Sequence, residues 1–146
     1  MFILLCQVPI YAGTYIDNGN GTITDISTGL IWQKCSIGQN NISCSGVALT
    51  DIWTNAINEC ENLNLGGNSN WRLPNINELK SLLSYTISVP PIIDNVIFPN
   101  SPSGYYWSST TYAISNSLAW AATTSTGSVN ANNKTNKYYI RCITSN

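Results

Sequence analysis

The chain contains no histidine, and it has only six Lys or Arg and seven Asp or Glu among 146 residues. Histidine is the usual general base for a serine or cysteine nucleophile, so the common form of that catalysis is excluded. A paired-carboxylate hydrolase needs two converging acids. Glu59 and Glu61 are two residues apart on a predicted helix and do not share a face, and Asp94 stands alone. We therefore expect no catalytic residues, no cofactor and no enzymatic activity.

Excess charge of either sign is also lacking, since the net charge is −1 and the sequence pI is near 5.0. The basic residues are scattered, so the chain lacks the basic surface that binds phosphate backbones. It equally lacks the clustered Lys or Arg that hold a protein to anionic lipid. We expect no nucleic-acid partner, weak binding of sulfated polymers, and a polar surface made mostly of neutral Asn, Ser and Thr.

Long apolar runs are absent as well, so no transmembrane segment is predicted. The first twelve residues, MFILLCQVPIYA, are apolar but too short to span a bilayer, and they end in a small residue. We interpret residues 1–12 as a signal peptide or its remnant, with a buried first strand as the alternative. Residues 13–146 then form a single domain that is large enough for one core. The protein is expected to be secreted, periplasmic or on the cell surface.

The cysteines are not arranged as a Cys-x-x-Cys pair, which with the lack of histidine argues against structural zinc and a thioredoxin-like redox site. Cys6 lies in the predicted signal segment, which leaves Cys35, Cys44, Cys60 and Cys142. An even set in an exported protein indicates two disulfides, and four cysteines allow three pairings. Cys35 and Cys44 flank a short polar loop, so a local bridge there is easy and would leave Cys60 with Cys142.

A calcium site is not predicted. Asp17, Asn18, Asn20 and Asp25 contain oxygen ligands, but their spacing misses the calcium-loop pattern, and glycines stand where ligands are needed. Residues 17–21 are instead typical of a β-turn. No metal ligands are therefore assigned.

Two helices are predicted from apolar periodicity and capping residues. The first runs from Thr50, its expected cap, to Leu63, with Cys60 on the inner face. The second begins at Asn75, whose side chain can cap the first turn while Glu78, three residues on, completes a capping box.

Strands are predicted on both sides of these helices. A meander is expected over residues 15–34, and later strands over 105–110, 118–123 and 138–143, with a hairpin turn at 125–127. Between the second helix and these later strands, Pro90-Pro91 and the residues up to Gly104 allow only irregular structure. The order of elements predicts an α+β fold with two helices beside antiparallel sheet.

Several of these segments together resemble a known family. The segments are, in chain order, Asp17–Thr22, Thr28–Gln33, Ala56 with Cys60, Leu65–Gly67, Trp71–Leu83, Phe98–Asn100, Tyr106–Thr110 and Arg141–Cys142. They resemble the Lcl C-terminal domain family, the C-terminal domain of bacterial collagen-like adhesins. The resemblance implies a C-type-lectin-like α+β fold stapled by disulfides, in which the helix-borne Cys60 bridges to Cys142 near the last strand.

The resemblance also implies a function, namely binding of a ligand or surface, with glycan adhesion as the best-known use. The founding adhesin is associated with polyanionic sugar polymers and with trimers. This chain lacks the collagen-like stalk and any basic surface, which argues against sulfated ligands and leaves a trimer resting on the resemblance alone. Phe98-Pro99-Asn100 also lacks the acidic ligand of calcium-dependent lectins.

The most conspicuous motif residues are assigned to the fold rather than to a ligand. Trp71 and Trp107 are expected in the core. Arg72 and Glu78 are expected to form a structural ion pair, and Pro74 to start the second helix.

Ligand binding is predicted instead on the segment from Thr86 to Asn116, through Tyr105, Tyr112 and Asn116. The ligand would be a neutral glycan or a surface protein. A structural or assembly module of the cell envelope is the alternative. A relative of the formylglycine-generating oxidases is a further one, and it would require a free reactive cysteine.

Overall fold

The computed structural model describes residues 14–145. The predicted signal segment and Cys6 lie outside the described residues. The first sheet is antiparallel with the strand order β1-β2-β3-β9. Its strands are β1 (Tyr15–Asp17), β2 (Thr22–Asp25), β3 (Leu30–Gln33) and β9 (Ile143–Ser145). The predicted meander is therefore confirmed, and β9 extends the sheet by pairing with β3.

The turn between β1 and β2 forms where the sequence predicts it. Asp17 Oδ1 accepts a hydrogen bond from the Gly19 amide at 2.9 Å, and Asp17 pairs with Lys34 at 2.8 Å. Gly21 has a positive φ of 83°, and a Cβ there would lie 2.6 Å from the Asn41 carbonyl oxygen. A glycine is therefore required at this point, where the turn contacts Asn41 of the loop that follows β3.

The second sheet has five strands in the order β4-β8-β5-β6-β7. The strands are β4 (Thr50–Asp51), β5 (Tyr105–Thr111), β6 (Leu118–Thr123), β7 (Val129–Asn133) and β8 (Tyr138–Tyr139). All pairs are antiparallel except β5 with β8. The predicted hairpin turn at 125–127 does join β6 to β7. The sequence VNANN of β7 was not predicted as a strand, since Asn is depleted in strands.

The single strand predicted over residues 138–143 is wrong. It is two strands, β8 and β9, which belong to different sheets. Ile140, Arg141 and Cys142 lie between them and are buried. The chain crosses from one sheet to the other here, so the pairing partner changes although the apolar pattern continues.

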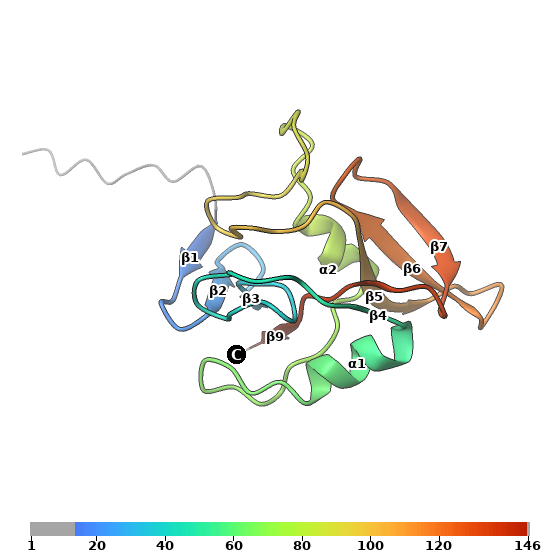
Figure 1. Cartoon of the computed structure of the whole chain (residues 1–146), viewed down its shortest axis with the longest axis horizontal. Helices are drawn as coiled ribbons and strands as arrows, with labels where there is room; N and C mark the ends of the chain where they lie inside the picture. The colour runs from blue at the N-terminus through green and yellow to red at the C-terminus, as the bar shows by residue number, and fades with distance from the viewer. Residues whose placement is uncertain (1–13, 146) are drawn as a thin grey trace, which may run out of the picture.

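Two helices, α1 (Trp53–Glu61) and α2 (Ile76–Ser81), cover opposite faces of the five-stranded sheet (Figure 1). Ala56 and Cys60 of α1 pack in one cluster with Trp107. Leu79 of α2 packs in another with Tyr106. Because Tyr106 and Trp107 are neighbours on β5, their side chains point to opposite faces. The α+β fold is confirmed, and the likeness to C-type lectins stays a prediction.

The expected cap of the first helix is wrong, whereas that of the second is confirmed. Thr50 belongs to β4 and pairs with Tyr139, and the N-cap of α1 is Ile52, which makes no side-chain cap. At α2, Asn75 accepts from the Glu78 amide and Glu78 accepts from the Asn75 amide. Sheet pairing thus moved the start of α1, while the start of α2 depends on local chemistry.

Two disulfides stabilise this fold, one local and one between distant parts of the chain. Cys35 pairs with Cys44 at a Cα–Cα distance of 4.9 Å, and Cys60 pairs with Cys142 at 5.4 Å. This is the pairing that the sequence favoured. The first closes the loop between β3 and β4, residues 34–49, which we call the disulfide loop. The second ties α1 to the crossing between β8 and β9.

Residues 82–104, which we call the long loop, form neither helix nor strand, and the prolines predicted this for the part from Pro90 to Gly104. Figure 1 shows this loop rising above α2 before it returns to β5. None of the helices within residues 14–145 is long and apolar enough to cross a membrane.

Candidate functional site

Tyr105, one of the predicted ligand residues, is half-buried at the start of β5. Its ring stacks on Tyr138 with 5.0 Å between centroids, and its hydroxyl accepts a hydrogen bond from Asn130 Nδ2 at 3.0 Å. The ring is therefore already engaged on one face by its own domain.

Tyr112 and Asn116 lie at the far end of β5, in the connection to β6. Tyr112 contacts Trp120 edge to face at 5.3 Å, and Asn116 is exposed. Tyr112 is seven positions after Tyr105 along an extended chain, which is about 23 Å at roughly 3.3 Å per residue. The structure therefore does not bring the three predicted residues into one site.

The two motif tryptophans are core residues with structural partners. Trp71 and Trp107 are buried, and their indole N–H groups donate to the carbonyl oxygens of Asn68, at 3.1 Å, and Asp51, at 2.9 Å. No ring face of either tryptophan is open to a ligand.

Arg72 and Glu78 form the structural pair that the sequence indicated. Two hydrogen bonds of 2.8 and 2.7 Å join the guanidinium to both carboxylate oxygens, and Glu78 Oε2 also accepts from the Asn75 amide at 2.8 Å. The hydrogen bond from Arg72 is the main reason that the pKa of Glu78 lies below its usual value. The Pro74 carbonyl oxygen accepts from the Ser109 amide at 2.8 Å, which holds the start of α2 against β5. These groups organise the start of α2 and do not face a pocket.

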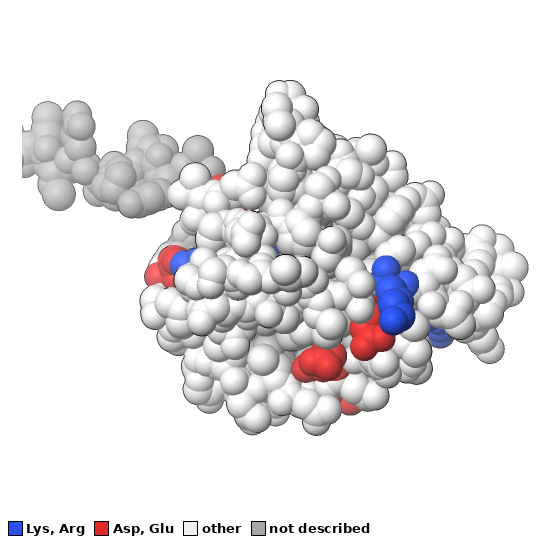
Figure 2. Space-filling model, viewed as in Figure 1, with Lys and Arg blue, Asp and Glu red and all other residues white. Residues whose placement is uncertain are grey.

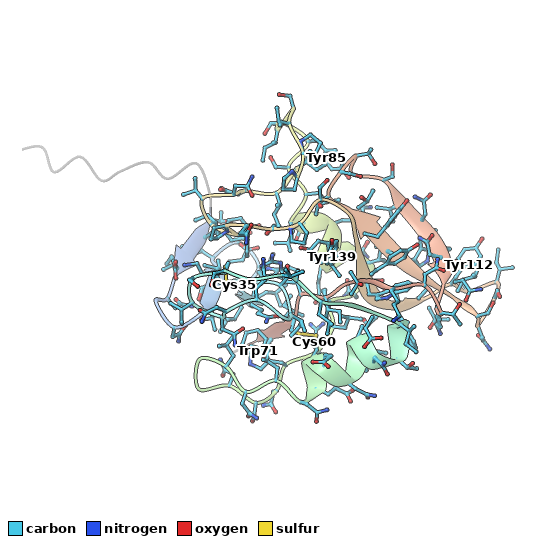
Figure 3. All side chains as sticks on the ribbon, in the orientation of Figure 1. Cys35, Cys60, Trp71, Tyr85, Tyr112 and Tyr139 are labelled. Atoms are coloured by element: carbon cyan, nitrogen blue, oxygen red, sulfur yellow. A yellow bond between two sulfur atoms is a disulfide. The ribbon has the colours of Figure 1, made fainter. Side chains whose placement is uncertain are left out.

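A groove lies where the disulfide loop meets the end of the long loop. Its volume is about 220 Å³. It is lined by Gln39, Gly46, Val47, Ala48, Asn100, Ser101, Pro102 and Tyr139. Tyr139, labelled in Figure 3, comes from β8, so three separate segments of the chain meet here. The lining contains amide, hydroxyl and aromatic groups and no charged side chain.

The two loops that form the groove are tied together by side-chain amides. Gln39 Nε2 donates to the Asn100 carbonyl oxygen at 2.9 Å, and Asn100 Nδ2 donates to the Cys44 carbonyl oxygen at 2.8 Å. Asn100 and Cys44 both have positive φ, 54° and 55°. Left-handed backbone is uncommon outside glycine, and it persists where surrounding contacts hold it. The groove is therefore preformed.

Arg141 supports the groove from beneath. It is buried, and it donates to Ser101 Oγ at 2.8 Å, to Ser36 Oγ at 3.2 Å and to the carbonyl oxygens of Gln33 and Lys34. Its guanidinium also lies 5.0 Å from the centre of the Phe98 ring. Burial lowers the pKa of Arg141. One cation thus connects β3, the disulfide loop and the long loop.

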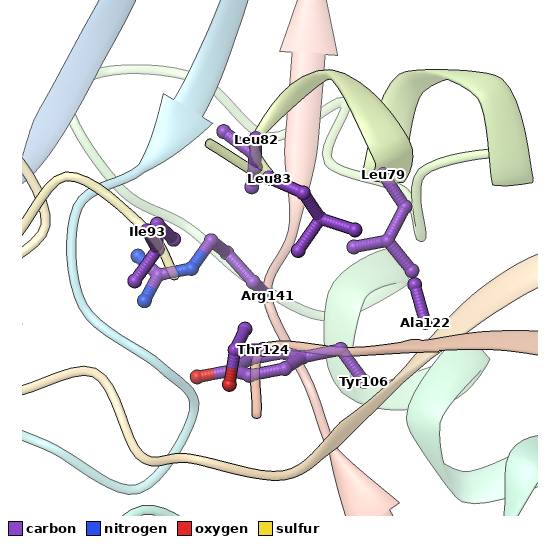
Figure 4. A pocket seen from close by; sticks show the side chains of 8 residues that line it. All are labelled: Leu79, Leu82, Leu83, Ile93, Tyr106, Ala122, Thr124 and Arg141. Carbon is purple, nitrogen blue, oxygen red and sulfur yellow. The ribbon is translucent and has the colours of Figure 1, made fainter. Parts of the chain in front are cut away.

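A second hollow lies behind Arg141 and is too small for a ligand (Figure 4). Its volume is about 10 Å³, which is room for about one water molecule. Leucine and isoleucine side chains supply half of its lining residues: Leu79, Leu82, Leu83 and Ile93. We interpret it as a packing gap between α2 and the long loop.

Charge is sparse around the groove. Figure 2 shows a face that is mostly uncharged over the disulfide loop and the long loop. Within residues 14–145, no three His, Cys, Asp or Glu side chains are grouped so that they could hold a metal ion. The groove can therefore form hydrogen bonds and aromatic contacts with a ligand, but it offers no ionic attraction.

The comparison with protein families supports the resemblance seen in the sequence. The family model described as Lcl C-terminal domain matches residues 21–144. The chain belongs to this family. The match includes every residue that lines the groove of this Lcl C-terminal domain. A search among curated proteins found no match.

The segment in which the sequence predicts ligand binding contributes part of the groove, and that binding stays a prediction. Asn100, Ser101 and Pro102 fall inside the segment from Thr86 to Asn116 where ligand binding was predicted. Gln39 and Tyr139 were missed, because the groove forms only when the disulfide loop and β8 pack beside the long loop. The one signal in the sequence is Phe98-Pro99-Asn100, a segment of the family resemblance that by itself does not indicate a site.

Proposed function

We propose that this Lcl C-terminal domain is a non-catalytic, extracellular recognition module whose groove binds one unit of a neutral glycan. The observation that carries the proposal is a preformed groove with a wholly uncharged lining. A rigid site loses little conformational entropy when it binds, and uncharged hydroxyl and amide groups suit the hydroxyl groups of a sugar.

The size of the groove favours a small ligand unit. At about 220 Å³ it is below the roughly 300–1,000 Å³ of sites for drug-sized ligands. One sugar ring of a longer chain fits this scale. Tyr139 supplies a ring and a hydroxyl group, and the Asn100 side chain supplies a carbonyl oxygen. A protein partner would insert a single side chain here.

The non-catalytic and extracellular parts of the proposal rest on the cysteines. Cys35, Cys44, Cys60 and Cys142 are all buried and all joined in disulfides. An oxidase of the formylglycine-generating kind needs a free reactive cysteine, and none of these four supplies it. Disulfides persist mainly in oxidising compartments, which favours export.

The experiment is a glycan and surface-protein array probed with the oxidised domain, followed by calorimetric titration of the best ligand. Val47→Asp is the test variant, because Val47 lines the groove and is 89% exposed. Val96→Asp is the matched control, because Val96 is 88% exposed on the long loop and does not line the groove.

We expect a neutral glycan to bind, Val47→Asp to weaken the affinity about tenfold or more, which is about 1.4 kcal/mol, and Val96→Asp to leave it unchanged. Binding of a protein alone would overturn the glycan as the ligand. Equal affinities for the two variants, or no binding on either array, would overturn the assignment of the groove.

A further inference from the structure

The strand β7 forms an open edge of the five-stranded sheet. It is last in the strand order, and Figure 1 shows it at the outside of the molecule. Within residues 14–145, β6 is the only strand that pairs with it. Its sequence, Val-Asn-Ala-Asn-Asn, contains neither a charged residue nor a proline. Those are the common devices that keep an edge strand from pairing with another chain.

The backbone groups that β7 presents at this edge follow from its pairing with β6. The Thr123 amide donates to the Ser128 carbonyl oxygen, and the Lys134 amide donates to the Ser117 carbonyl oxygen, both at 2.9 Å. Hydrogen bonding to the partner strand alternates along an antiparallel ladder. The even-numbered residues 128–134 therefore direct their backbone N–H and C=O groups toward β6. The odd-numbered residues 129–133 direct theirs outward, away from β6.

This edge is complementary to itself. We propose that β7 pairs antiparallel with β7 of a second copy of the chain, about a two-fold axis at Ala131, so that the two five-stranded sheets become continuous. Ala131 then exchanges both backbone hydrogen bonds with Ala131 of the second copy. Val129 lies opposite Asn133 of the second copy, so every outward-facing residue of β7 meets another outward-facing residue. The Asn133 carbonyl oxygen already accepts from the Asn136 amide at 2.9 Å, and its second lone pair serves the Val129 amide.

The side chains of β7 suit this register. Asn130 comes to lie opposite Asn132 of the second copy, in the close, non-hydrogen-bonded type of pair, where amide groups can bond to each other. Asn130 is already held by its hydrogen bond to the Tyr105 hydroxyl at 3.0 Å, and Asn132 Nδ2 donates to the Asn130 carbonyl oxygen at 3.0 Å. These contacts order both amides on one face of the strand.

Charge does not oppose the pairing. Lys134 directly follows β7, but its ammonium group donates to Thr111 Oγ1 at 2.9 Å and lies 3.8 Å from the centre of the Trp53 ring. It is thus engaged by its own copy. The net charge of −1 per chain adds little repulsion. The groove includes Tyr139 of β8, which β5 and β6 separate from β7, so pairing leaves the groove open.

One pair of five-residue strands is a small interface, so we expect a weak dimer that forms with rising concentration. Sedimentation velocity of the oxidised chain over a concentration series measures it. Hydrogen exchange locates it, because the outward amides of Val129, Ala131 and Asn133 become protected as concentration rises. The inward amides of Asn130 and Asn132 are protected at every concentration.

The first variant is Ala131→Pro, which removes the central outward N–H without removing a bond to β6 and suits an edge strand. We expect it to stay monomeric, while the control Ala131→Ser, which keeps the N–H, dimerises as the natural chain does. A monomer at all concentrations for the natural chain would overturn the proposal. So would a dimer that survives Ala131→Pro in a folded protein.

A pair of charge variants tests the register. N130D/N132D places like charges opposite each other across the two-fold axis, whereas N130D/N132K places opposite charges there. We expect the first to be monomeric near neutral pH and the second to dimerise. If the two variants had the same oligomeric state, the proposed register would be wrong, and with it the self-pairing of β7.

Discussion

Arg141 is a fully buried cation without a carboxylate partner among residues 14–145. Instead it donates to backbone carbonyl oxygens and to the hydroxyl groups of Ser36 and Ser101. The ring of Phe98 covers one side of the guanidinium. A planar group with several donors in a fixed arrangement is what this site requires, because its acceptors come from separate segments of the chain.

We therefore predict that Arg141→Lys strongly destabilises the domain. A lysine has a single ammonium group and cannot reach all of these acceptors, and leaving one buried acceptor unpaired costs about 1–3 kcal/mol. The free energy of unfolding should fall by about 2–3 kcal/mol in urea titrations followed by tryptophan fluorescence. Arg72→Lys is the matched control at an exposed site, where the loss should stay below about 1 kcal/mol. Equal losses at the two sites would show that Arg141 does not hold the loops together.

The helix α2 is short, and its start is organised by a small polar network. Asn75 and Glu78 form the capping box, and Arg72 binds the Glu78 carboxylate from the preceding segment. A helix of this length is not stable by itself, so its position depends on this cap and on burial of Leu79 against the sheet.

Glu78→Gln should lower the free energy of unfolding at pH 7 by about 1 kcal/mol, through loss of the charged half of the cap. The pKa of Glu78 is lowered in the folded state, chiefly by the hydrogen bond from Arg72. Its stabilisation is therefore complete above the unfolded pKa of about 4.3 and is lost as the pH falls through the folded pKa. The difference between Glu78→Gln and the natural chain should shrink in acid, as measured by urea unfolding from about pH 7 to about pH 3.

Glu61→Gln is the control for this pH series. Glu61 is exposed at the end of α1, and its side chain makes no hydrogen bond or ion pair within residues 14–145. Its substitution should change the free energy of unfolding little at any pH. A Glu78→Gln difference that stays constant down to about pH 3 would contradict an ionised Glu78 as the source of the stabilisation.

At the scale of the whole molecule, the two disulfides have different structural roles. The Cys60–Cys142 bridge spans 82 residues and joins α1 to the crossing between the two sheets. The Cys35–Cys44 bridge spans nine residues and shapes the disulfide loop that forms one side of the groove. The first therefore restricts the whole unfolded chain, and the second acts mainly on the site.

Removing the Cys60–Cys142 bridge should mainly lower the free energy of unfolding, whereas removing the Cys35–Cys44 bridge should also weaken ligand binding to the groove. In the chain-entropy view, replacing Cys60 and Cys142 by alanine costs about 4–5 kcal/mol, and replacing Cys35 and Cys44 costs about 3 kcal/mol. Urea unfolding of the two double variants measures the order. Any ligand of the groove should lose more affinity in the folded C35A/C44A variant than a distant substitution such as Val96→Asp causes. If the C35A/C44A variant lost more free energy of unfolding than the C60A/C142A variant, this assignment of roles to the two bridges would be wrong.

Some of the fold follows from the sequence because short-range chemistry determines it. The turn before β2 follows from its glycines, and the start of α2 follows from Asn75 and Glu78. The early meander follows from alternation and turn residues. The start of α1 does not, because β4 pairs with β8 and takes Thr50 into the sheet. The sequence likewise does not indicate the division between β8 and β9, since both lie in one continuous strand-like stretch.

The sequence by itself determined the class of fold, the family resemblance, the favoured disulfide pairing and the uncharged character of the surface. The fold class and the uncharged surface depend on composition and on local patterns, and the family resemblance depends on the order of short segments along the chain. The favoured pairing follows because Cys35 and Cys44 lie close together in sequence and leave Cys60 for Cys142. Only the tertiary structure decided which segments form the groove and which strand forms an edge of the five-stranded sheet. Gln39, Asn100 and Tyr139 are far apart in sequence, whereas Tyr105 begins β5 and Tyr112 follows its last residue. The reason is physical: a groove and a sheet edge exist only after the strands have taken their order.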